Sequence, residues 1–247
     1  MVAVRDPSMI ARLAIALLAV LAPAAAEAAC TVASVAAATP GGSLPQTAAR
    51  LRAHQPLKIL AIGSSSTAGF GGGGAGFANQ LGPLIKSRAP QSAIEVVISG
   101  VPAETASGAA GRLQAEIAAH RPHLVVWQLG TNDANFGVSP ESFRATVASG
   151  LAAIRGAGAD AVLVDPQFSR WAEGSGATAI KARIIAEEGA RRGVPVARRF
   201  AAMQRLAATN RPAFDGLISW DGLHLSPAGH ACMAEQIAGT ILRTARR

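Results

Sequence analysis

The chain has 247 residues, of which 50% are hydrophobic and 15% charged, so it can bury one sizeable core and lacks the composition of a disordered protein. Its formal net charge is +8, but the arginines are spread along the sequence and only 4% of residues are aromatic. Because basic residues are neither clustered nor interleaved with aromatic ones, we do not expect a nucleic-acid-binding protein.

The N-terminal segment has the layout of a secretory signal peptide. Arg5 and Arg12 precede an apolar run over residues 13–21, and an A-x-A cleavage pattern follows at residues 26–28. The run is too short to span a bilayer. We therefore predict a signal peptide over residues 1–28, a periplasmic or secreted protein, and no stable membrane anchor.

Apolar strands and helical stretches alternate after a loosely structured lead-in over residues 29–56, for which one short helix is expected. The expected strands are 57–62, 94–98, 124–129, 161–164 and 194–197. The expected helices are 77–88, 104–120, 140–155, 178–192 and 226–243. This alternation predicts one α/β domain over residues 57–247, with a parallel sheet that helices cover on both faces.

Polar residues follow three of the expected strands and precede the last expected helix. They read Gly-Ser-Ser-Ser-Thr-Ala-Gly over residues 63–69, Gly-Val-Pro-Ala-Glu-Thr over 100–105, Gly-Thr-Asn-Asp over 130–133 and Asp-Gly-Leu-His over 221–224. In parallel sheets the active site forms beyond the carboxyl ends of the strands, where the first three loops are expected to meet. The fourth adds a carboxylate and an imidazole within one short loop.

Together the four blocks resemble the SGNH, or GDSL-type, hydrolase superfamily, and the resemblance extends from Lys58 to about Ile241 in the family's order. It implies a three-layer α/β/α sandwich with a flavodoxin-like parallel sheet of about five strands. It also implies hydrolysis of carboxylic esters through an acyl-serine intermediate, without a metal or organic cofactor. For an exported enzyme, O-acyl groups on glycans are the substrates we favour over cytosolic metabolites.

The resemblance also assigns roles to individual residues. Ser65 takes the position of the nucleophile, and Asp221 and His224 take those of the remaining catalytic residues. A serine hydroxyl needs a base to remove its proton, and an imidazole held by a carboxylate can do this. The backbone N–H groups of Ser65 and Ala103 and the side-chain amide of Asn132 are the expected oxyanion donors.

Two positions depart from the family's pattern. Ser64 replaces the Asp of the first block, which is not the catalytic carboxylate, so catalysis need not suffer. Ala103 replaces the Gly of the second block. Alanine keeps the backbone N–H, although its methyl group could crowd the acyl site. Asp133, at the end of the third block, is expected to be structural.

Two further pairs of residues carry predictions. Phe168 and Trp171 follow the fourth expected strand, and we expect them to border the cleft and contact substrate; the alternative is that Trp171 packs its loop onto the core. Cys30 and Cys232 are the two cysteines of the chain, and both would meet an oxidising compartment after export. We predict a disulfide between them, the alternative being that Cys232 is a small buried apolar residue.

Competing interpretations have less support. Gly71, Gly73 and Gly76 match G-x-G-x-x-G, but the preceding strand ends near Ile62, too far upstream for a dinucleotide site. The other histidines are expected to be structural or on the surface; they are His54, His120, His123 and His230. A thioesterase or lysophospholipase would carry the same four blocks, and a noncatalytic glycan-binding or assembly protein could keep the fold. The acyl group, the alcohol and the oligomeric state stay open.

Overall fold

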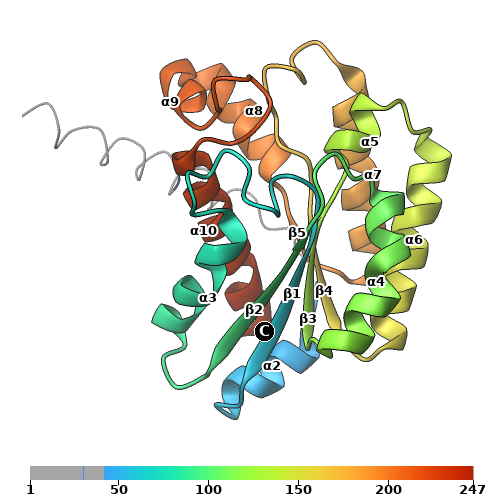
Figure 1. The fold of residues 1–247 in the computed structure, drawn as a ribbon, viewed down its shortest axis with the longest axis vertical. Coiled ribbons are helices and arrows are strands. Elements are labelled where there is room, and N and C mark those ends of the chain that lie inside the picture. Colours follow the sequence, from blue (N-terminus) through green and yellow to red (C-terminus); the bar gives the residue numbers. More distant parts are fainter. Residues whose placement is uncertain (1–29, 31–41, 247) are drawn as a thin grey trace, which may run out of the picture.

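A five-stranded parallel sheet forms the centre of the chain in the computed structural model, which describes residue 30 and residues 42–246 (Figure 1). The strand order is β2-β1-β3-β4-β5, which confirms the predicted flavodoxin-like sheet. The strands are β1 (Leu57–Gly63), β2 (Ile94–Gly100), β3 (Leu124–Gln128), β4 (Asp160–Val164) and β5 (Val196–Ala197). The predicted signal peptide lies outside the described residues.

Helices cover both faces of the sheet, as predicted. Their bounds are α2 (Pro45–Arg52), α3 (Phe77–Arg88), α4 (Ala106–His120), α5 (Thr131–Asn135), α6 (Pro140–Gly156), α7 (Gly176–Arg192), α8 (Arg199–Thr209), α9 (Arg211–Gly216) and α10 (Pro227–Ala245). Figure 1 shows α3 and α10 on one face and α4, α6 and α7 on the other. None of the helices in the described part of the chain is long and apolar enough to be a transmembrane segment.

Two hydrophobic cores result from the alternation of side chains along the strands. On β1, Leu57, Ile59 and Ala61 join the core beneath α3 and α10, whereas Leu60 and Ile62 join the core beneath α4, α6 and α7. Strands β1, β3 and β4 are buried on both faces, which is why the sequence shows nearly continuous apolar runs there, whereas the edge strand β2 is partly exposed.

Among the described residues, the sequence analysis missed helices α5, α8 and α9. Helix α5 has 5 residues and begins inside the third polar block, and α9 has 6 residues. Segments this short do not span enough turns for a hydrophobic period to be read. Helix α8 has 11 residues and follows β5, which is only 2 residues long, so no clear boundary separates the two.

The last helix begins as predicted and thereby places the fourth polar block. Ser226 caps α10 by accepting a hydrogen bond from the backbone N–H of Gly229 at 3.1 Å, and Pro227 occupies the first turn. Because the cap fixes where the helix starts, the loop that carries Asp221 and His224 is held directly against its N-terminal end.

Cys30 and Cys232 lie together but are not joined by a disulfide in this structure. Their side chains are hydrogen-bonded, and this contact, followed by burial, raises the pKa of the Cys232 thiol above its ordinary value. The contact supports the predicted pairing, since it places the two thiols beside one another. The disulfide itself stays a prediction.

Candidate active site

The loop after β1 presents Ser65 on a turn that a buried glutamine holds in place. Gly63 ends the strand at a φ of +156°, and a Cβ there would come within 2.8 Å of the Gln128 side-chain oxygen. That oxygen accepts three hydrogen bonds, from Ser64 N, Ser64 Oγ and Thr67 Oγ1, at 3.0 to 3.1 Å. Ser65 itself stays partly exposed between the buried Ser64 and Ser66. Hydrogen bonds to Gln128 thus hold the buried side of the turn, and the Ser65 side chain is left accessible.

Ser65, His224 and Asp221 form one hydrogen-bonded series. The Ser65 hydroxyl oxygen lies 2.9 Å from His224 Nε2, and His224 Nδ1 lies 2.6 Å from an Asp221 carboxylate oxygen. Ser65 and His224 are 159 positions apart in sequence, so the fold alone brings them together. With Nδ1–H donated to the carboxylate, Nε2 is available to accept the proton of the Ser65 hydroxyl.

Asp221 is held as an ionised carboxylate by its own loop. Its second oxygen accepts hydrogen bonds from the backbone N–H groups of Leu223 and His224, both at 2.9 Å. Partial burial raises the pKa of Asp221, but the hydrogen bonds from the His224 ring and from these two backbone groups outweigh it, so the pKa lies below its ordinary value. The carboxylate therefore stays charged beside the imidazole.

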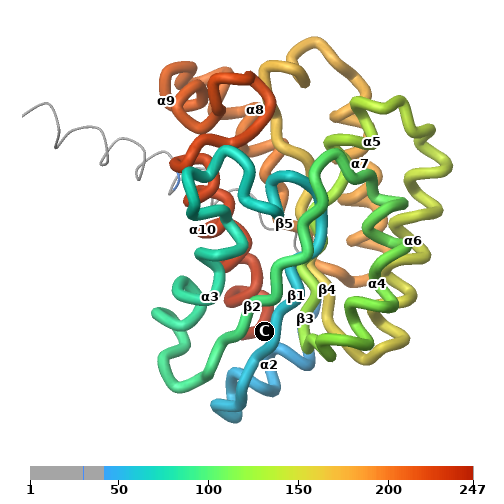
Figure 2. Tube along the Cα trace, viewed as in Figure 1, coloured from blue at the N-terminus to red at the C-terminus, as the bar shows by residue number. Residues whose placement is uncertain are grey.

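The glycine-rich loop after Ser65 packs against the histidine loop. The Phe70 ring lies 4.6 Å from the His224 ring between centroids. Gly71 has a φ of +86°, and a Cβ there would overlap the carbonyl oxygen of Leu225. Figure 2 shows this loop, between β1 and α3, running beside the N-terminal end of α10. These glycines let the two backbones approach closely, which a side chain would prevent.

His230, which the sequence analysis placed among the structural or surface histidines, connects these elements. Its ring is fully buried, accepts a hydrogen bond from Phe77 N at 3.1 Å through Nδ1, and faces the carbonyl oxygen of Phe70 at 2.8 Å through Nε2. Burial lowers the pKa of His230, so the neutral ring donates to that carbonyl. The imidazole thereby ties the Phe70 loop to α10.

The predicted oxyanion loops lie together. The Asn132 side-chain nitrogen donates to the carbonyl oxygen of Glu104 at 2.8 Å, which leaves its second N–H for another acceptor. A Cβ on Gly100 would come within 2.7 Å of Ala68 Cα, so the loop after β2 also abuts the loop that carries Ser65. Ala103 is exposed and has a φ of +62°, the left-handed region that explains why the family favours glycine there.

Asp133 has the structural surroundings that the sequence analysis expected. It is buried, and its carboxylate accepts the backbone N–H of Ala106, the first residue of α4, at 3.0 Å. It also accepts the N–H of Gly130 at 3.2 Å. Burial raises the pKa of Asp133, with these hydrogen bonds opposing the rise. The side chain therefore joins the third polar block to the start of α4.

Two buried glutamines that hold the site were missed. Gln167 accepts a hydrogen bond from Thr131 Oγ1 and donates to the carbonyl oxygen of Leu223, both at 3.1 Å, so it bridges the Asn132 loop and the histidine loop. Gln128, described above, ends an otherwise apolar strand, and a polar residue at that position was the signal from which its role could have been predicted. Nothing in the local sequence distinguishes Gln167.

The expected substrate contacts separate into one buried and one exposed aromatic residue. Phe168 was predicted to border the cleft, but it is only 9% exposed and packs edge-on against Phe200 and at a tilt against Phe214, each at 5.6 Å. That prediction was wrong, because helices α8 and α9 cover the residue. Trp171 is 61% exposed, and its indole N–H donates to the carbonyl oxygen of Asp221 at 3.2 Å.

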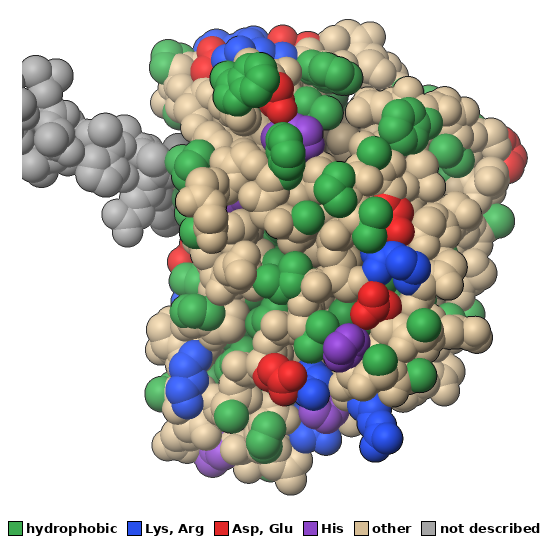
Figure 3. Space-filling model, in the orientation of Figure 1, with side chains coloured by type: hydrophobic (Ala, Val, Ile, Leu, Met, Phe, Trp, Pro, Cys, Tyr) green, Lys and Arg blue, Asp and Glu red, His purple; other side chains and the backbone are tan. Residues whose placement is uncertain are grey.

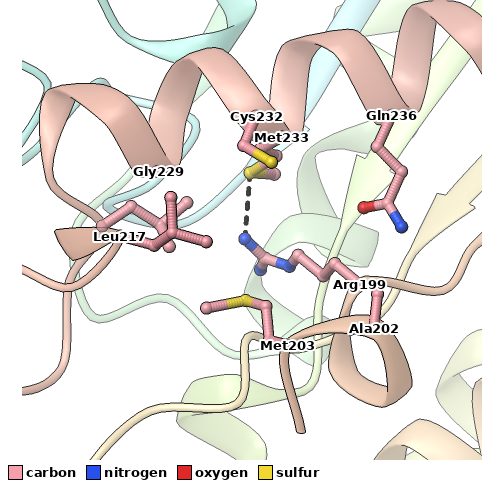
Figure 4. Close-up of a pocket in the computed structure, with 9 residues that line it drawn as sticks. Arg199, Ala202, Met203, Leu217, Gly229, Cys232, Met233 and Gln236 are labelled. Carbon is pink, nitrogen blue, oxygen red and sulfur yellow. Dashed lines mark hydrogen bonds between the residues drawn. The ribbon is translucent and has the colours of Figure 1, made fainter. Parts of the chain in front are cut away.

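A small cavity lies between α8 and α10, and Ser65, Asp221 and His224 are not among the residues that line it (Figure 4). The buried Arg199 extends into it, donating to Met233 Sδ at 2.9 Å and to the carbonyl oxygen of Asp165 at 2.6 Å. Burial lowers the pKa of Arg199 to about 10. The cavity therefore belongs to the packing that supports α10. Elsewhere in the described residues, no cluster of His, Cys, Asp and Glu side chains is arranged to hold a metal ion.

Comparison with known proteins identifies a family. The model of a family described as "Non-GDSL lipase-like family" matches residues 29–247. No curated protein gives a significant sequence match.

Solved structures share the fold at low sequence identity. A lipase/acylhydrolase from Enterococcus faecalis is 24% identical, with a TM-score of 0.62 over 74% of this chain and 93% of that one. A catalytic mutant of Axe2, an acetylxylan esterase from Geobacillus stearothermophilus, is 21% identical, with a TM-score of 0.65 over 75% and 94% of the two chains. A two-domain esterase active on acetylated mannans is 20% identical, with a TM-score of 0.67 over 85% of this chain and 56% of that one.

Proposed function

The chain belongs to the non-GDSL lipase-like family and carries four blocks that resemble those of SGNH hydrolases, and from this premise we propose that it is an exported serine esterase. The observation that carries the proposal is the unbroken series of hydrogen bonds from Ser65 Oγ through the His224 ring to Asp221. Four separate sequence blocks meet around that series. Each block alone is weak evidence for a hydrolase, so their meeting at one place supports the proposal. A serine that only terminated a strand would need neither a base nor a carboxylate behind it.

In the first half of the reaction, His224 Nε2 takes the proton of the Ser65 hydroxyl as the oxygen attacks the ester carbonyl carbon. Asp221 stabilises the imidazolium that forms and does not itself become protonated. The resulting tetrahedral intermediate collapses when its bond to the alcohol oxygen breaks, and the imidazolium returns its proton to that oxygen. The alcohol leaves, and the acyl group stays on Ser65.

In the second half, a water molecule takes the place of the alcohol. His224 removes a proton from this water, and the hydroxide attacks the acyl carbonyl carbon. Collapse of the second tetrahedral intermediate breaks the bond to Ser65, whose oxygen recovers a proton from His224. The carboxylic acid is released and the enzyme is regenerated, so the cycle needs no cofactor.

The negative charge on each tetrahedral intermediate requires donors. We assign the backbone N–H groups of Ser65 and Ala103 and the second N–H of the Asn132 amide to this role. One such donor is worth roughly 3 kcal/mol of barrier. The tether from Asn132 to the Glu104 carbonyl supports the assignment, because it holds the amide beside the Ala103 backbone before any charge develops.

For the substrate we propose O-acyl groups on glycans. The N-terminal signal-peptide pattern supports an extracytoplasmic substrate. Two proteins with the same fold are described as an acetylxylan esterase and as an esterase active on acetylated mannans. This chain's own aromatic residues give the proposal a more specific form below.

The proposed function is tested with the purified mature protein and a short-chain ester. We expect turnover of p-nitrophenyl acetate and covalent labelling of Ser65 by a fluorophosphonate, and the loss of both in Ser65→Ala. Ser142→Ala is the control, because this exposed serine lies in the first turn of α6 and, within the described residues, its hydrogen bonds are to Ser139 and Thr146 only. Labelling at Ser64 or Ser66, or retained turnover in Ser65→Ala, would contradict the proposal.

A further inference from the structure

The exposed large hydrophobic side chains of the described residues gather at one end of the molecule. They are Phe70, Ile98, Val101, Phe136, Trp171 and Trp220. Each lies at or beyond the carboxyl end of a strand, or in the loop that precedes α10. Figure 3 shows several hydrophobic side chains at the end where α5, α8 and α9 lie, and others spread over the rest of this face. Exposed hydrophobic residues are normally scattered, so their collection around Ser65 indicates a contact surface.

The two tryptophans of this group flank the turn that holds Asp221. Trp220 precedes Asp221 in the chain and is 92% exposed. Trp171 comes from the loop after β4 and donates its indole N–H to the Asp221 carbonyl. Between them, Gly222 has a φ of +73°, and a Cβ there would lie 3.6 Å from the Trp171 ring. The Trp171 ring is therefore held in place while most of it stays accessible.

The chemistry of the proposed reaction assigns this pair to one side of the substrate. The group that protonates the departing alcohol must lie within hydrogen-bond reach of its oxygen, so the alcohol leaves next to His224 Nε2. The assigned oxyanion donors come from other loops, after β1, β2 and β3. Since Trp220 and Asp221 share the short loop of His224, the tryptophan pair lies on the alcohol side of the ester rather than the acyl side.

Charged side chains next to the tryptophans favour a sugar over a lipid surface. Arg170 pairs with Asp215 at 3.3 Å, Asp215 pairs with Arg211 at 3.1 Å, and Arg211 pairs with Glu173 at 3.0 Å. All four side chains are more than a third exposed, at 35% to 48% of their surface. Inserting Trp171 and its neighbour Arg170 into a bilayer would desolvate this network at high cost, whereas sugar hydroxyl groups can hydrogen-bond to it.

From these observations we infer that Trp171 and Trp220 form a subsite that binds a sugar ring in the alcohol part of the ester. The inference rests on the proposed esterase function. A pyranose ring presents C–H groups on its faces and hydroxyl groups at its edge, so it suits a flat indole with polar groups beside it. The pair thus selects the esterified alcohol, and the acyl group is selected elsewhere.

The experiment compares two alcohols at a constant acyl group, and two acyl groups at a constant alcohol. The substrates are fully acetylated xylobiose, ethyl acetate and ethyl octanoate, with the released acid measured directly; p-nitrophenyl esters are avoided because their aromatic alcohol could itself stack on tryptophan. In Trp220→Ala we expect kcat/KM for acetylated xylobiose to fall roughly tenfold relative to ethyl acetate, mainly through KM, because the indole binds substrate and transition state alike. Trp171→Ala should shift the same ratio.

Phe136→Ala is the matched control, because Phe136 is as exposed as Trp171, at 61%, but follows the Asn132 block. It should leave the ratio of acetylated xylobiose to ethyl acetate unchanged. The inference is overturned if the wild type has the higher kcat/KM for ethyl acetate, or if Trp220→Ala lowers kcat/KM for both acetates equally. It is also overturned if Trp220→Ala instead lowers the ratio of kcat/KM for ethyl octanoate to that for ethyl acetate, which would assign the tryptophans to the acyl chain. Absence of turnover of every ester by the wild type would overturn the proposed function as well.

Discussion

Replacing Gly71 with alanine should separate the glycine loop from the histidine loop. Gly71 has a φ of +86°, and an added Cβ would overlap the Leu225 carbonyl oxygen and lie 3.5 Å from His224 Cβ. Gly74, in the same loop, has a φ of +90° but nothing within 4 Å of an added Cβ. The two variants therefore share the backbone strain, and only Gly71→Ala adds the overlap.

The expected magnitudes follow from that difference. Alanine in the left-handed region costs about 1–2 kcal/mol in either variant. The overlap adds about 1–3 kcal/mol in Gly71→Ala, the usual range for overpacking. Relieving it to an ordinary C···O separation of roughly 3.3 Å requires the Leu225 carbonyl to move by about 1 Å. His224 precedes that carbonyl, so its 2.9 Å contact with Ser65 should lengthen beyond hydrogen-bonding distance.

Thermal unfolding and steady-state kinetics on a short-chain ester measure the two effects. Relative to Gly74→Ala, we expect Gly71→Ala to melt roughly 2–12 °C lower, from about 2–4 °C per kcal/mol for a domain of this size. Its kcat/KM should fall about a hundredfold, as for other displacements of about 1 Å, whereas Gly74→Ala should keep wild-type turnover. If the two variants share one Tm and one kcat, the glycine loop does not hold the imidazole against Ser65.

Three further predictions test other parts of the site. Asn132→Ala should lower kcat about a hundredfold with little change in KM, because an oxyanion donor acts mainly in the transition state. An unchanged kcat in steady-state kinetics would show that Asn132 only holds its neighbouring loop. Gln167→Leu should lower the free energy of unfolding by about 2 kcal/mol in urea titrations, since it leaves the Leu223 carbonyl without its buried donor; an unchanged value would refute the bridging role. The exported protein, denatured without reductant, should show no reactive thiol if Cys30 and Cys232 are bonded, a closure worth at most about 5 kcal/mol, and two thiols per chain would refute the disulfide.

The alternation of strands and helices was readable from the sequence because it depends on local patterns. Apolar runs such as residues 57–62 suit strands that are buried on both faces, and a Gly or Pro within two residues of the end marks where four of the five runs stop. The candidate residues Ser65, Asp221 and His224 were also readable, because four polar blocks occur in one order, although each block alone would also suit an ordinary turn or loop. The resemblance of their blocks to a known superfamily supplied the order and the roles.

Only the tertiary structure decided which side chains face the site and what holds them there. Phe168 and Trp171 are three positions apart in one loop, yet packing from α8 and α9 buries the first and leaves the second exposed. The three hydrogen bonds on the Gln128 oxygen and the bridge made by Gln167 likewise join segments that are distant in sequence. A residue's own neighbours in the chain set its backbone preference, but its burial and its partners depend on which other segments pack against it. That is why the proposed nucleophile and its proposed base could be named from the sequence, whereas the side chains that support them and the aromatic surface beside them could not.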